Sequence, residues 1–248
     1  MRIHAFHRLY QHRQSLSTRT FKARGAKVSR CEYCQVATKH CLCDYQPSVD
    51  TGVAAMLIVS ENEVFKPSNT GRLIADVVQE TSVYQWNRTE PEQEMLDMLC
   101  DPNYFPMVVF PEEYVDDKSR LIEESESHAK LVDNKTPLLI FIDGSWREAR
   151  KIFRRSEYLQ SLPVFSIKPD SVSQYMMRKS DNEDHLSTAE VAAIVLEKVG
   201  EQEASRVLEM WFETFKESYL LTKTRLKPDL SKPALKRFLK ELNFESQL

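Results

Sequence analysis

Short apolar runs alternate along this chain with longer segments in which apolar residues recur at helical spacing. The runs have the length of buried strands, and they lie at residues 53–59, 82–86, 107–110, 138–142 and 164–167. The segments with helical spacing lie at residues 71–80, 91–100, 118–132 and 146–156, and long helices are expected from residue 188 onward. Strands that alternate with helices in this way predict an α/β fold with a largely parallel sheet.

The composition narrows the classes of function. The 248 residues include only five glycines, so a glycine-rich dinucleotide loop of the Rossmann type has no support. No window approaches the run of about 18 apolar residues that spans a membrane, and the basic N-terminus lacks the apolar stretch of a secretory signal. Five cysteines, an odd number, do not suggest a disulfide framework. We therefore expect a cytoplasmic protein, with Cys100 in the core because it ends an apolar helical face.

Charge is distributed unevenly along the chain. The first 30 residues carry eight Lys or Arg side chains and no Asp or Glu, whereas the remainder carries 26 basic and 37 acidic side chains. The net charge of -3 therefore combines a cationic N-terminal arm with an acidic body. Such an asymmetry indicates either an anionic partner for the arm or a solvated terminus.

Four cysteines follow the basic arm within thirteen positions. Cys31 and Cys34 form a C-x2-C pair, and Cys41 and Cys43 form a C-x-C pair after a gap of six residues. Four thiolates can surround a tetrahedral zinc ion, so the sequence predicts a compact structural zinc site, with His40 as an alternative ligand. A redox dithiol and a chance cluster are the other interpretations. A redox C-x-x-C motif usually opens a helix after a strand, which is not the pattern here.

Three polar loops precede helices, at residues 66–70, 143–145 and 185–187. The Ser145–Glu148 and Ser187–Glu190 spacings are those of capping boxes. Helix N-termini attract anionic groups, and ligands of parallel sheets bind beyond the carboxyl ends of the strands. The loops are therefore expected either to surround one ligand or to act simply as helix caps.

The segment around Asp143 carries further candidate chemistry. Asp143 ends an apolar strand, where its carboxylate can face the crevice or cap the next helix. Trp146 lies on the apolar stripe of that helix and is expected to pack in the core. A second face carries four basic residues at helical spacing, which suit either phosphates or solvent: Arg147, Arg150, Lys151 and Arg154.

At these residues the chain resembles the DTW-domain family of tRNA-uridine aminocarboxypropyltransferases, and its bacterial members most closely. The family motif D-x-T-W corresponds to "DGSW" at residues 143–146, with Ser145 in place of Thr. The resemblance covers most of the chain, including the cysteine cluster. It rests also on "KPSNTGRLIAD" (66–76), "QWNRTEP" (85–91), "MVVFP" (107–111), "DGSWREARKIFR" (143–154) and "STAE" (187–190).

The resemblance implies a specific reaction. Family members transfer the 3-amino-3-carboxypropyl group of S-adenosylmethionine to N3 of a tRNA uridine, at variable-loop position 47 in the bacterial relatives, and release methylthioadenosine. A SPOUT-like knotted fold is implied as well. Asp143 is the expected general base, and Trp146 a further catalytic candidate. The residues expected at the cofactor are Thr70, Pro111, Ser145, Trp146, Ser187 and Thr188.

The expected organisation follows from these assignments. Residues 1–50 form the basic arm and zinc module, residues 51–225 the catalytic domain, and residues 226–248 a C-terminal helical tail. The arm should bind tRNA through Arg19, Lys22, Arg24 and Lys27, together with the basic helix face. No membrane and no obligate protein partner are implied. The alternatives are a SPOUT-type RNA methyltransferase and a non-catalytic, zinc-dependent RNA-binding protein.

Overall fold

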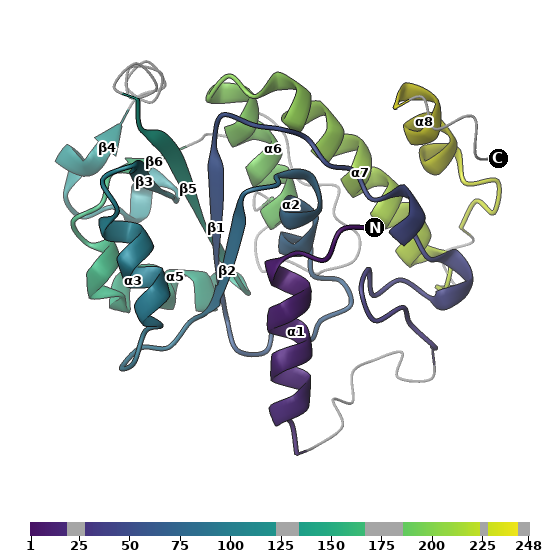
Figure 1. Cartoon of the computed structure of the whole chain (residues 1–248), viewed down its shortest axis with the longest axis horizontal. Helices are drawn as coiled ribbons and strands as arrows, with labels where there is room; N and C mark the ends of the chain where they lie inside the picture. The colour runs from purple at the N-terminus through teal and green to yellow at the C-terminus, as the bar shows by residue number, and fades with distance from the viewer. Residues whose placement is uncertain (19–27, 123–133, 167–185, 224–227, 243–248) are drawn as a thin grey trace.

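The chain folds around a parallel sheet, as seen in a computed structural model that describes residues 1–18, 28–122, 134–166, 186–223 and 228–242 (Figure 1). Within these residues the sheet has the strand order β2-β1-β5-β3-β6-β4, and each neighbouring pair is parallel. The strands are β1 (Ala54–Val59), β2 (Thr81–Gln85), β3 (Tyr104–Val109), β4 (Leu121–Ile122), β5 (Thr136–Asp143) and β6 (Val164–Phe165). The predicted α/β class is confirmed.

Helices cover both faces of the sheet because successive side chains of a buried strand point to opposite sides. Along β1, Leu57 and Val59 belong to one hydrophobic cluster, whereas Met56 and Ile58 belong to the other. The second cluster is closed by α3 (Gln93–Cys100) and α5 (Trp146–Arg155). The first is closed by α1 (Ala5–Leu16), α2 (Gly71–Val77), α6 (Thr188–Lys198), α7 (Gln202–Leu220) and α8 (Pro233–Glu241).

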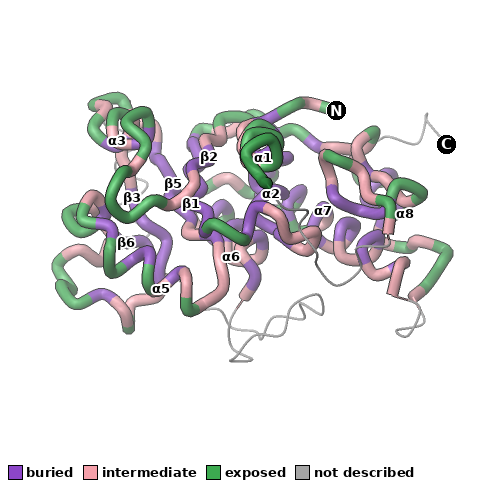
Figure 2. The backbone as a smooth tube through the Cα atoms, turned by 90° about the horizontal axis from the view of Figure 1, so that it is seen from below, coloured by how far each residue is buried: buried purple, intermediate pink, exposed green. Residues whose placement is uncertain are grey.

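The N-terminal segment is part of this core rather than a purely solvated arm. Phe6 in α1 and Val36 and Leu42 beside the cysteines are buried in the same cluster as α6 and α7. The rest of α1 is exposed over much of its length (Figure 2). The Arg2 guanidinium donates hydrogen bonds to the carbonyl oxygens of Ala75 and Asp76 at 2.8 and 3.0 Å. Sequence reasoning missed α1, because its high content of basic and polar residues hides a narrow apolar side.

Two predictions about structure are corrected. Residues 118–122 were expected to begin a helix, but they form a 3-10 turn at Lys118–Arg120 and then strand β4. The strand has only two residues and is held by pairing with β6, a non-local contact that no local pattern reveals; residues 123–132 lie outside the described part of the chain. Cys100 is exposed rather than in the core: it is the last residue of α3, whose buried residues are Met95 and Leu99.

Candidate functional site

The three polar loops meet at one carboxylate. Asp143 is the last residue of β5 and has no exposed surface. Asn69 Nδ2 donates a hydrogen bond to Asp143 Oδ2 at 2.5 Å, and Thr188 Oγ1 donates one to Asp143 Oδ1 at 2.7 Å. The Ala189 amide also points at Thr70 Oγ1, 3.5 Å away. Segments more than forty residues apart in sequence are thus tied together at the carboxyl ends of β1 and β5.

The backbone around Asp143 explains why this arrangement is tight. Val59 of β1 pairs with Asp143, and the Ser60 amide donates to the Asp143 carbonyl oxygen at 2.8 Å. Helix α2 begins directly against the carboxyl group, so a Cβ atom at Gly71 would lie 2.7 Å from Asp143 Oδ2. Only glycine permits so close an approach without displacing the side chain.

Burial raises the pKa of Asp143, and the hydrogen bonds from Asn69 and Thr188 oppose that shift. A buried carboxylate is costly unless it is paired or hydrogen-bonded. Nearby, the Lys66 ammonium lies 2.6 Å from Oε2 of the buried Glu63, and Asn69 Nδ2 lies 3.4 Å from Glu63 Oε1. Both Asp143 oxygens accept a bond, so the geometry suits a carboxylate that fixes the loops, and a basic role requires these bonds to rearrange.

Two of the loops are closed by the predicted capping boxes, which the structure confirms. The Glu148 amide donates to Ser145 Oγ at 3.4 Å, and the Ser145 amide donates to Glu148 Oε2 at 2.9 Å. Ser187 and Glu190 make the same pair of bonds at the start of α6. The serine in place of the motif's threonine therefore keeps the hydroxyl function of a cap.

The remaining cofactor candidates lie around these loops. Thr70 is fully buried at the start of α2, and Trp146 is half-buried at the first position of α5. Pro111 is half-buried after β3, which is the neighbour of β5 in the sheet. All of them lie at the end of the sheet where the parallel strands terminate, which is the usual place for a ligand in such folds.

Aromatic rings line this end of the sheet. Phe110 stacks on Phe153 at 4.2 Å and on Trp146 at 5.6 Å between ring centroids. Tyr114 meets Trp146 edge to face at 5.1 Å. On the basic face of α5, Arg147, Lys151 and Arg154 are exposed, whereas Arg150 is half-buried with its Cζ 5.8 Å from the Tyr114 and Trp146 ring centroids.

The four clustered cysteines have the geometry of a tetrahedral thiolate site. Cys31 Sγ lies 3.5 Å from Cys43 Sγ, Cys34 Sγ lies 3.8 Å from Cys41 Sγ, and all four sulfur atoms lie within 4.8 Å of one another. Zinc–sulfur bonds of about 2.3 Å in a tetrahedron place sulfur atoms about 3.8 Å apart. The donor set and spacing therefore fit zinc.

Arg72 connects the cysteine module to the Asp143 loops. Its buried guanidinium donates to the Tyr33 carbonyl oxygen, inside the C-x2-C turn, at 3.3 Å and to the Lys66 carbonyl oxygen at 3.1 Å. Its backbone amide donates to Asn69 Oδ1 at 3.1 Å, which orients the amide that binds Asp143. Sequence reasoning missed Arg72 and Gly71, and it named Asn69 only as one of the polar residues of the loop at 66–70. The only signal was their place in the quoted segment 66–76.

A second polar cluster holds α1 to the body. His4 Nε2 lies 3.0 Å from Asp76 Oδ1, Gln46 Nε2 donates to the same oxygen at 2.5 Å, and Trp211 Nε1 donates to Asp76 Oδ2 at 2.9 Å. The rings of His4 and His7 stack at 3.7 Å, and burial lowers the pKa of His7 to about 4. Both carboxylate oxygens already accept donors, so these residues fit a structural hydrogen-bond network better than a metal site.

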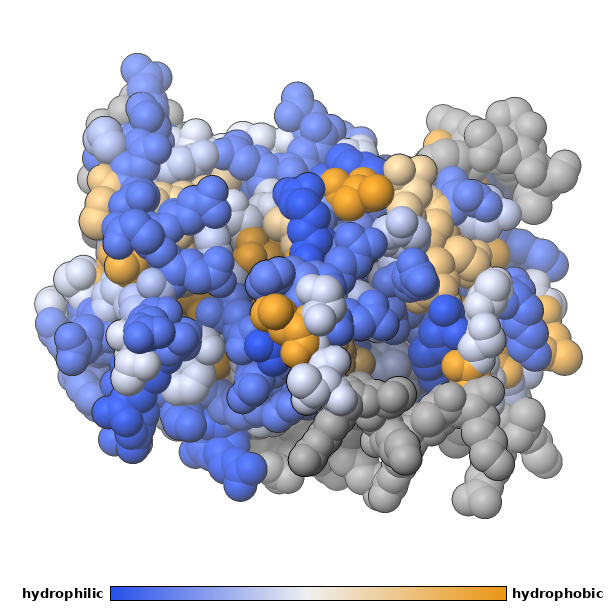
Figure 3. Space-filling model, turned by 60° about the horizontal axis from the view of Figure 1, so that its bottom comes forward, coloured by the Kyte–Doolittle hydropathy of each residue, from blue (hydrophilic) through white to orange (hydrophobic). Residues whose placement is uncertain are grey.

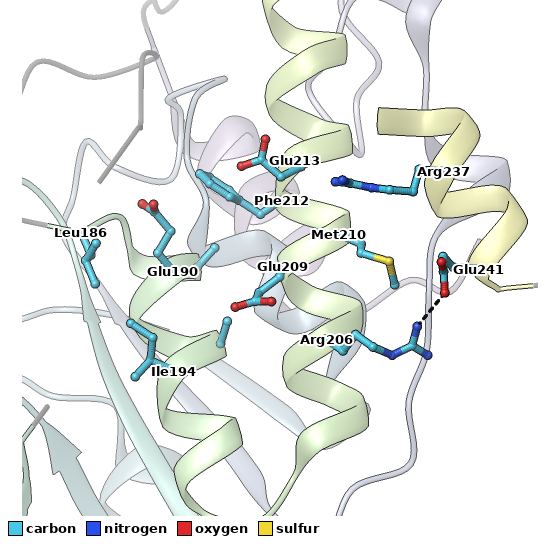
Figure 4. A pocket seen from close by; sticks show the side chains of 12 residues that line it. Leu186, Glu190, Ile194, Arg206, Glu209, Met210, Phe212, Glu213, Arg237 and Glu241 are labelled. Carbon is cyan, nitrogen blue, oxygen red and sulfur yellow. Dashed lines mark hydrogen bonds and ion pairs between the residues drawn. The ribbon is translucent and has the colours of Figure 1, made fainter. Parts of the chain in front are cut away.

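A cavity of about 580 Å³ lies between α6, α7 and α8, and it borders the start of α6, where Ala189 and Glu190 line it (Figure 4). Its lining includes four glutamates and two arginines, of which Arg206 pairs with Glu241 at 3.3 Å. None of the residues that bind the Asp143 carboxylate lines it. Its acidic lining is unsuited to a polyanion.

Part of the predicted RNA-binding surface lies outside the residues that the structure describes. This part consists of Arg19, Lys22, Arg24 and Lys27. Figure 3, in which the underside of Figure 1 comes forward, shows a mainly hydrophilic surface with a few small hydrophobic patches. None of the described helices combines the length and apolar character needed to span a bilayer.

Comparisons with known proteins agree with the motifs. The chain is 24% identical over 173 residues to tRNA-uridine aminocarboxypropyltransferase 2 of Macaca fascicularis, a match that covers 67% of this chain and 55% of the relative. The chain thus spans about half the length of this curated relative. No solved structure matches. The DTW domain family matches residues 28–220, from the cysteine module to the end of α7. This match covers most of the sequence, and the chain belongs to the DTW-domain family.

Proposed function

We propose that this protein transfers the 3-amino-3-carboxypropyl group of S-adenosylmethionine to N3 of a tRNA uridine, at variable-loop position 47. The observation that carries the proposal is the meeting of three loops at Asp143, within the "DGSW" segment of a DTW domain. The name of the relative, a tRNA-uridine aminocarboxypropyltransferase, supports the same reaction. The proposal also includes three further points. The protein is of the bacterial type, its fold is knotted and SPOUT-related, and it acts in the cytoplasm.

The proposed step is a substitution at carbon. Uridine N3 forms a bond to the aminocarboxypropyl carbon next to sulfur, the carbon–sulfur bond breaks, and sulfur keeps the electron pair in methylthioadenosine. The N3 proton passes to a base, and Asp143 is the candidate after its bonds from Asn69 and Thr188 rearrange. Because the sulfonium is already activated, the main task of the site is to align this carbon rather than the methyl group with N3.

Binding of the two substrates is assigned to different surfaces. Thr70, Pro111, Ser145, Trp146, Ser187 and Thr188 shape the S-adenosylmethionine site in this proposal. The exposed cations of α5 contact the phosphates of tRNA, together with the arm residues Arg19, Lys22, Arg24 and Lys27. The four cysteines hold a zinc ion that stabilises the fold around the Tyr33 turn and takes no part in the transfer.

The identity of the released nucleoside tests the reaction. The protein incubated with S-adenosylmethionine and unmodified tRNA should release methylthioadenosine, and the tRNA should gain one 3-amino-3-carboxypropyl group by mass spectrometry. Adenosylhomocysteine would instead show methyl transfer, as in the SPOUT methyltransferase alternative. Release of neither, with tRNA still bound, would favour the non-catalytic RNA-binding alternative.

The role of Asp143 is tested by Asp143→Asn, with the exposed Asp50→Asn as the matched control. Loss of a general base typically lowers turnover about 10²- to 10⁴-fold. Asp143→Asn should therefore bind S-adenosylmethionine and turn over in that reduced range, whereas Asp50→Asn should match wild type. Near-normal turnover of Asp143→Asn at saturating tRNA would leave Asp143 as a positioning residue only.

A further inference from the structure

An aromatic ledge with a cation above it lies at the end of the sheet beside Asp143. The 3-10 turn at Glu112–Tyr114 follows β3 and brings the Tyr114 ring edge to face with Trp146, at 5.1 Å between centroids. Phe110 supports both rings, at 5.9 Å from Tyr114 and 5.6 Å from Trp146. Because β3 and β5 are neighbours in the sheet, this ledge adjoins the loop that carries Asp143.

The ledge has a buried base and a partly exposed top. Phe110 and Phe153 are 4% and 2% exposed, and they stack on each other at 4.2 Å. Tyr114 and Trp146 keep part of their surface exposed. The Tyr114 and Trp146 rings stand at 74° to each other, so each ring presents its own face, and a single aromatic face held by a rigid support is what stacks a nucleobase in RNA-binding sites.

Arg150 adds a positive charge to the same place. Its Cζ lies 5.8 Å from both the Tyr114 and the Trp146 ring centroids. Among the residues that the structure describes, no carboxylate forms an ion pair with Arg150. Its charge is therefore available to a ligand, while Arg147, Lys151 and Arg154 are exposed on the same helix.

We propose that Tyr114 and Arg150 form the subsite for the target base, with the uracil ring packed on Tyr114 and an adjacent phosphate at Arg150. The proposed reaction brings two bases to this end of the sheet, the uracil of tRNA and the adenine of S-adenosylmethionine, and the positive charge of Arg150 distinguishes between them. S-adenosylmethionine carries a sulfonium, an ammonium and one carboxylate, a net charge of about +1 at neutral pH, whereas an RNA strand is a polyanion, so a guanidinium favours the RNA strand. Tyr114 therefore holds the base of the polyanion rather than the adenine of the co-substrate, whereas Trp146 keeps its place in the proposed S-adenosylmethionine site. This inference rests on the proposed function, and it assigns Tyr114 a role in binding the substrate uridine.

Substitution of the ring tests the subsite in the full-length protein. Stacking of one base on an aromatic side chain corresponds to about a 5- to 150-fold change in affinity. Tyr114→Ala should raise the KM for tRNA within that range and leave the Kd for S-adenosylmethionine unchanged. Tyr114→Phe should behave like wild type, because the ring is retained. Arg150→Ala should also raise the KM for tRNA, with a weaker dependence on salt than in wild type.

Tyr104→Ala is the matched control, since Tyr104 is also half-buried but lies at the opposite end of β3. It should leave both substrate affinities unchanged in folded protein. A Tyr114→Ala variant that folds and keeps the wild-type KM for tRNA would overturn the subsite. A weaker Kd for S-adenosylmethionine with unchanged tRNA affinity would overturn it too, because the ledge would then hold adenine.

A binding measurement separates this inference from the proposed reaction. Quenching of tryptophan fluorescence by a short oligouridylate measures binding without turnover. Tyr114→Ala should raise the Kd for the oligouridylate about 5- to 150-fold, the range expected for the KM for tRNA. If wild type makes no modified tRNA but this difference remains, the reaction is wrong and the base subsite stands. If wild type makes the expected product and the difference is missing, the subsite is wrong and the reaction stands.

Discussion

Gly71→Ala tests whether the Asp143 carboxylate is fixed as tightly as its contacts imply. In a first helical turn, alanine in place of glycine normally stabilises a protein by about 0.5–1 kcal/mol. Here the added Cβ would lie 2.7 Å from Asp143 Oδ2 and 2.8 Å from Asp143 Cγ, whereas ordinary contacts begin at 3.4 Å. The carboxyl group must move, and its bonds to Asn69 and Thr188 resist that movement.

The size of the effect follows from the number of bonds lost. A hydrogen bond to a charged group contributes about 1.5–3 kcal/mol. After the gain from helix formation is subtracted, the variant should be less stable by about 0.5–2.5 kcal/mol if one bond breaks and by about 2–5.5 kcal/mol if both break. Since 1 kcal/mol shifts the Tm of a protein of this size by about 2–4 °C, thermal unfolding can measure it.

Gly52→Ala is the matched control for this substitution. Gly52 is exposed, and its Cβ would lie 3.1 Å from Glu201 Oε1, which accepts a hydrogen bond from the Gly52 amide at 2.7 Å. Because this oxygen ends a flexible side chain that can shift by a few tenths of an ångström, the change should stay within about 0.5 kcal/mol. An equal or higher Tm for Gly71→Ala than for wild type would refute the reasoning. In that case the Asp143 side chain moves freely and its two donors do not fix it.

Two further predictions concern the metal and the buried charge. Purified protein should contain about one zinc ion per chain, and removal of the zinc by a chelator should lower the Tm. The reason is that structural zinc contributes roughly 10–16 kcal/mol of apparent binding energy in small peptides. Protein that contains no zinc and keeps the same Tm would contradict this prediction. The pKa of Asp143 is raised above 3.8 by burial, so its contribution to stability is full below that pH and is lost as pH rises through the folded-state pKa. Urea unfolding should therefore show wild type losing stability relative to Asp143→Asn from acidic to neutral pH, whereas parallel pH curves would exclude the shift.

The sequence correctly predicted those elements that depend on residues close together in the chain. The strands β1, β3 and β5 were recognised because each is buried on both faces and therefore reads as a continuous apolar run. The capping boxes at Ser145 and Ser187 were recognised because both partners lie within four residues. The cysteine cluster was equally easy to recognise, because its four thiols are close in sequence.

The other features of the fold and the site depend on contacts between residues that are far apart in the sequence. The two-residue strand β4 exists only through its pairing with β6. Asn69 and Thr188 are separated by more than a hundred residues, yet both bind Asp143. Tyr114 reaches Trp146 only because β3 and β5 are adjacent in the sheet, although β5 follows β3 through an intervening strand. Their places in the site could not be read before the strand order was known.

The same contacts argue that the cysteine module is more than a separate RNA-binding attachment. Arg72 is buried, and burial lowers its pKa, so its guanidinium depends on acceptors that the surrounding backbone supplies. One of these acceptors is the carbonyl oxygen of Tyr33, between the first two cysteines, and another is that of Lys66. If the turn at Tyr33 unfolds, a buried charge loses a partner beside Asn69, which holds Asp143. Metal binding at the cysteines would therefore contribute to the order of the candidate active site, although Asp143 lies a hundred residues after Cys43 in sequence.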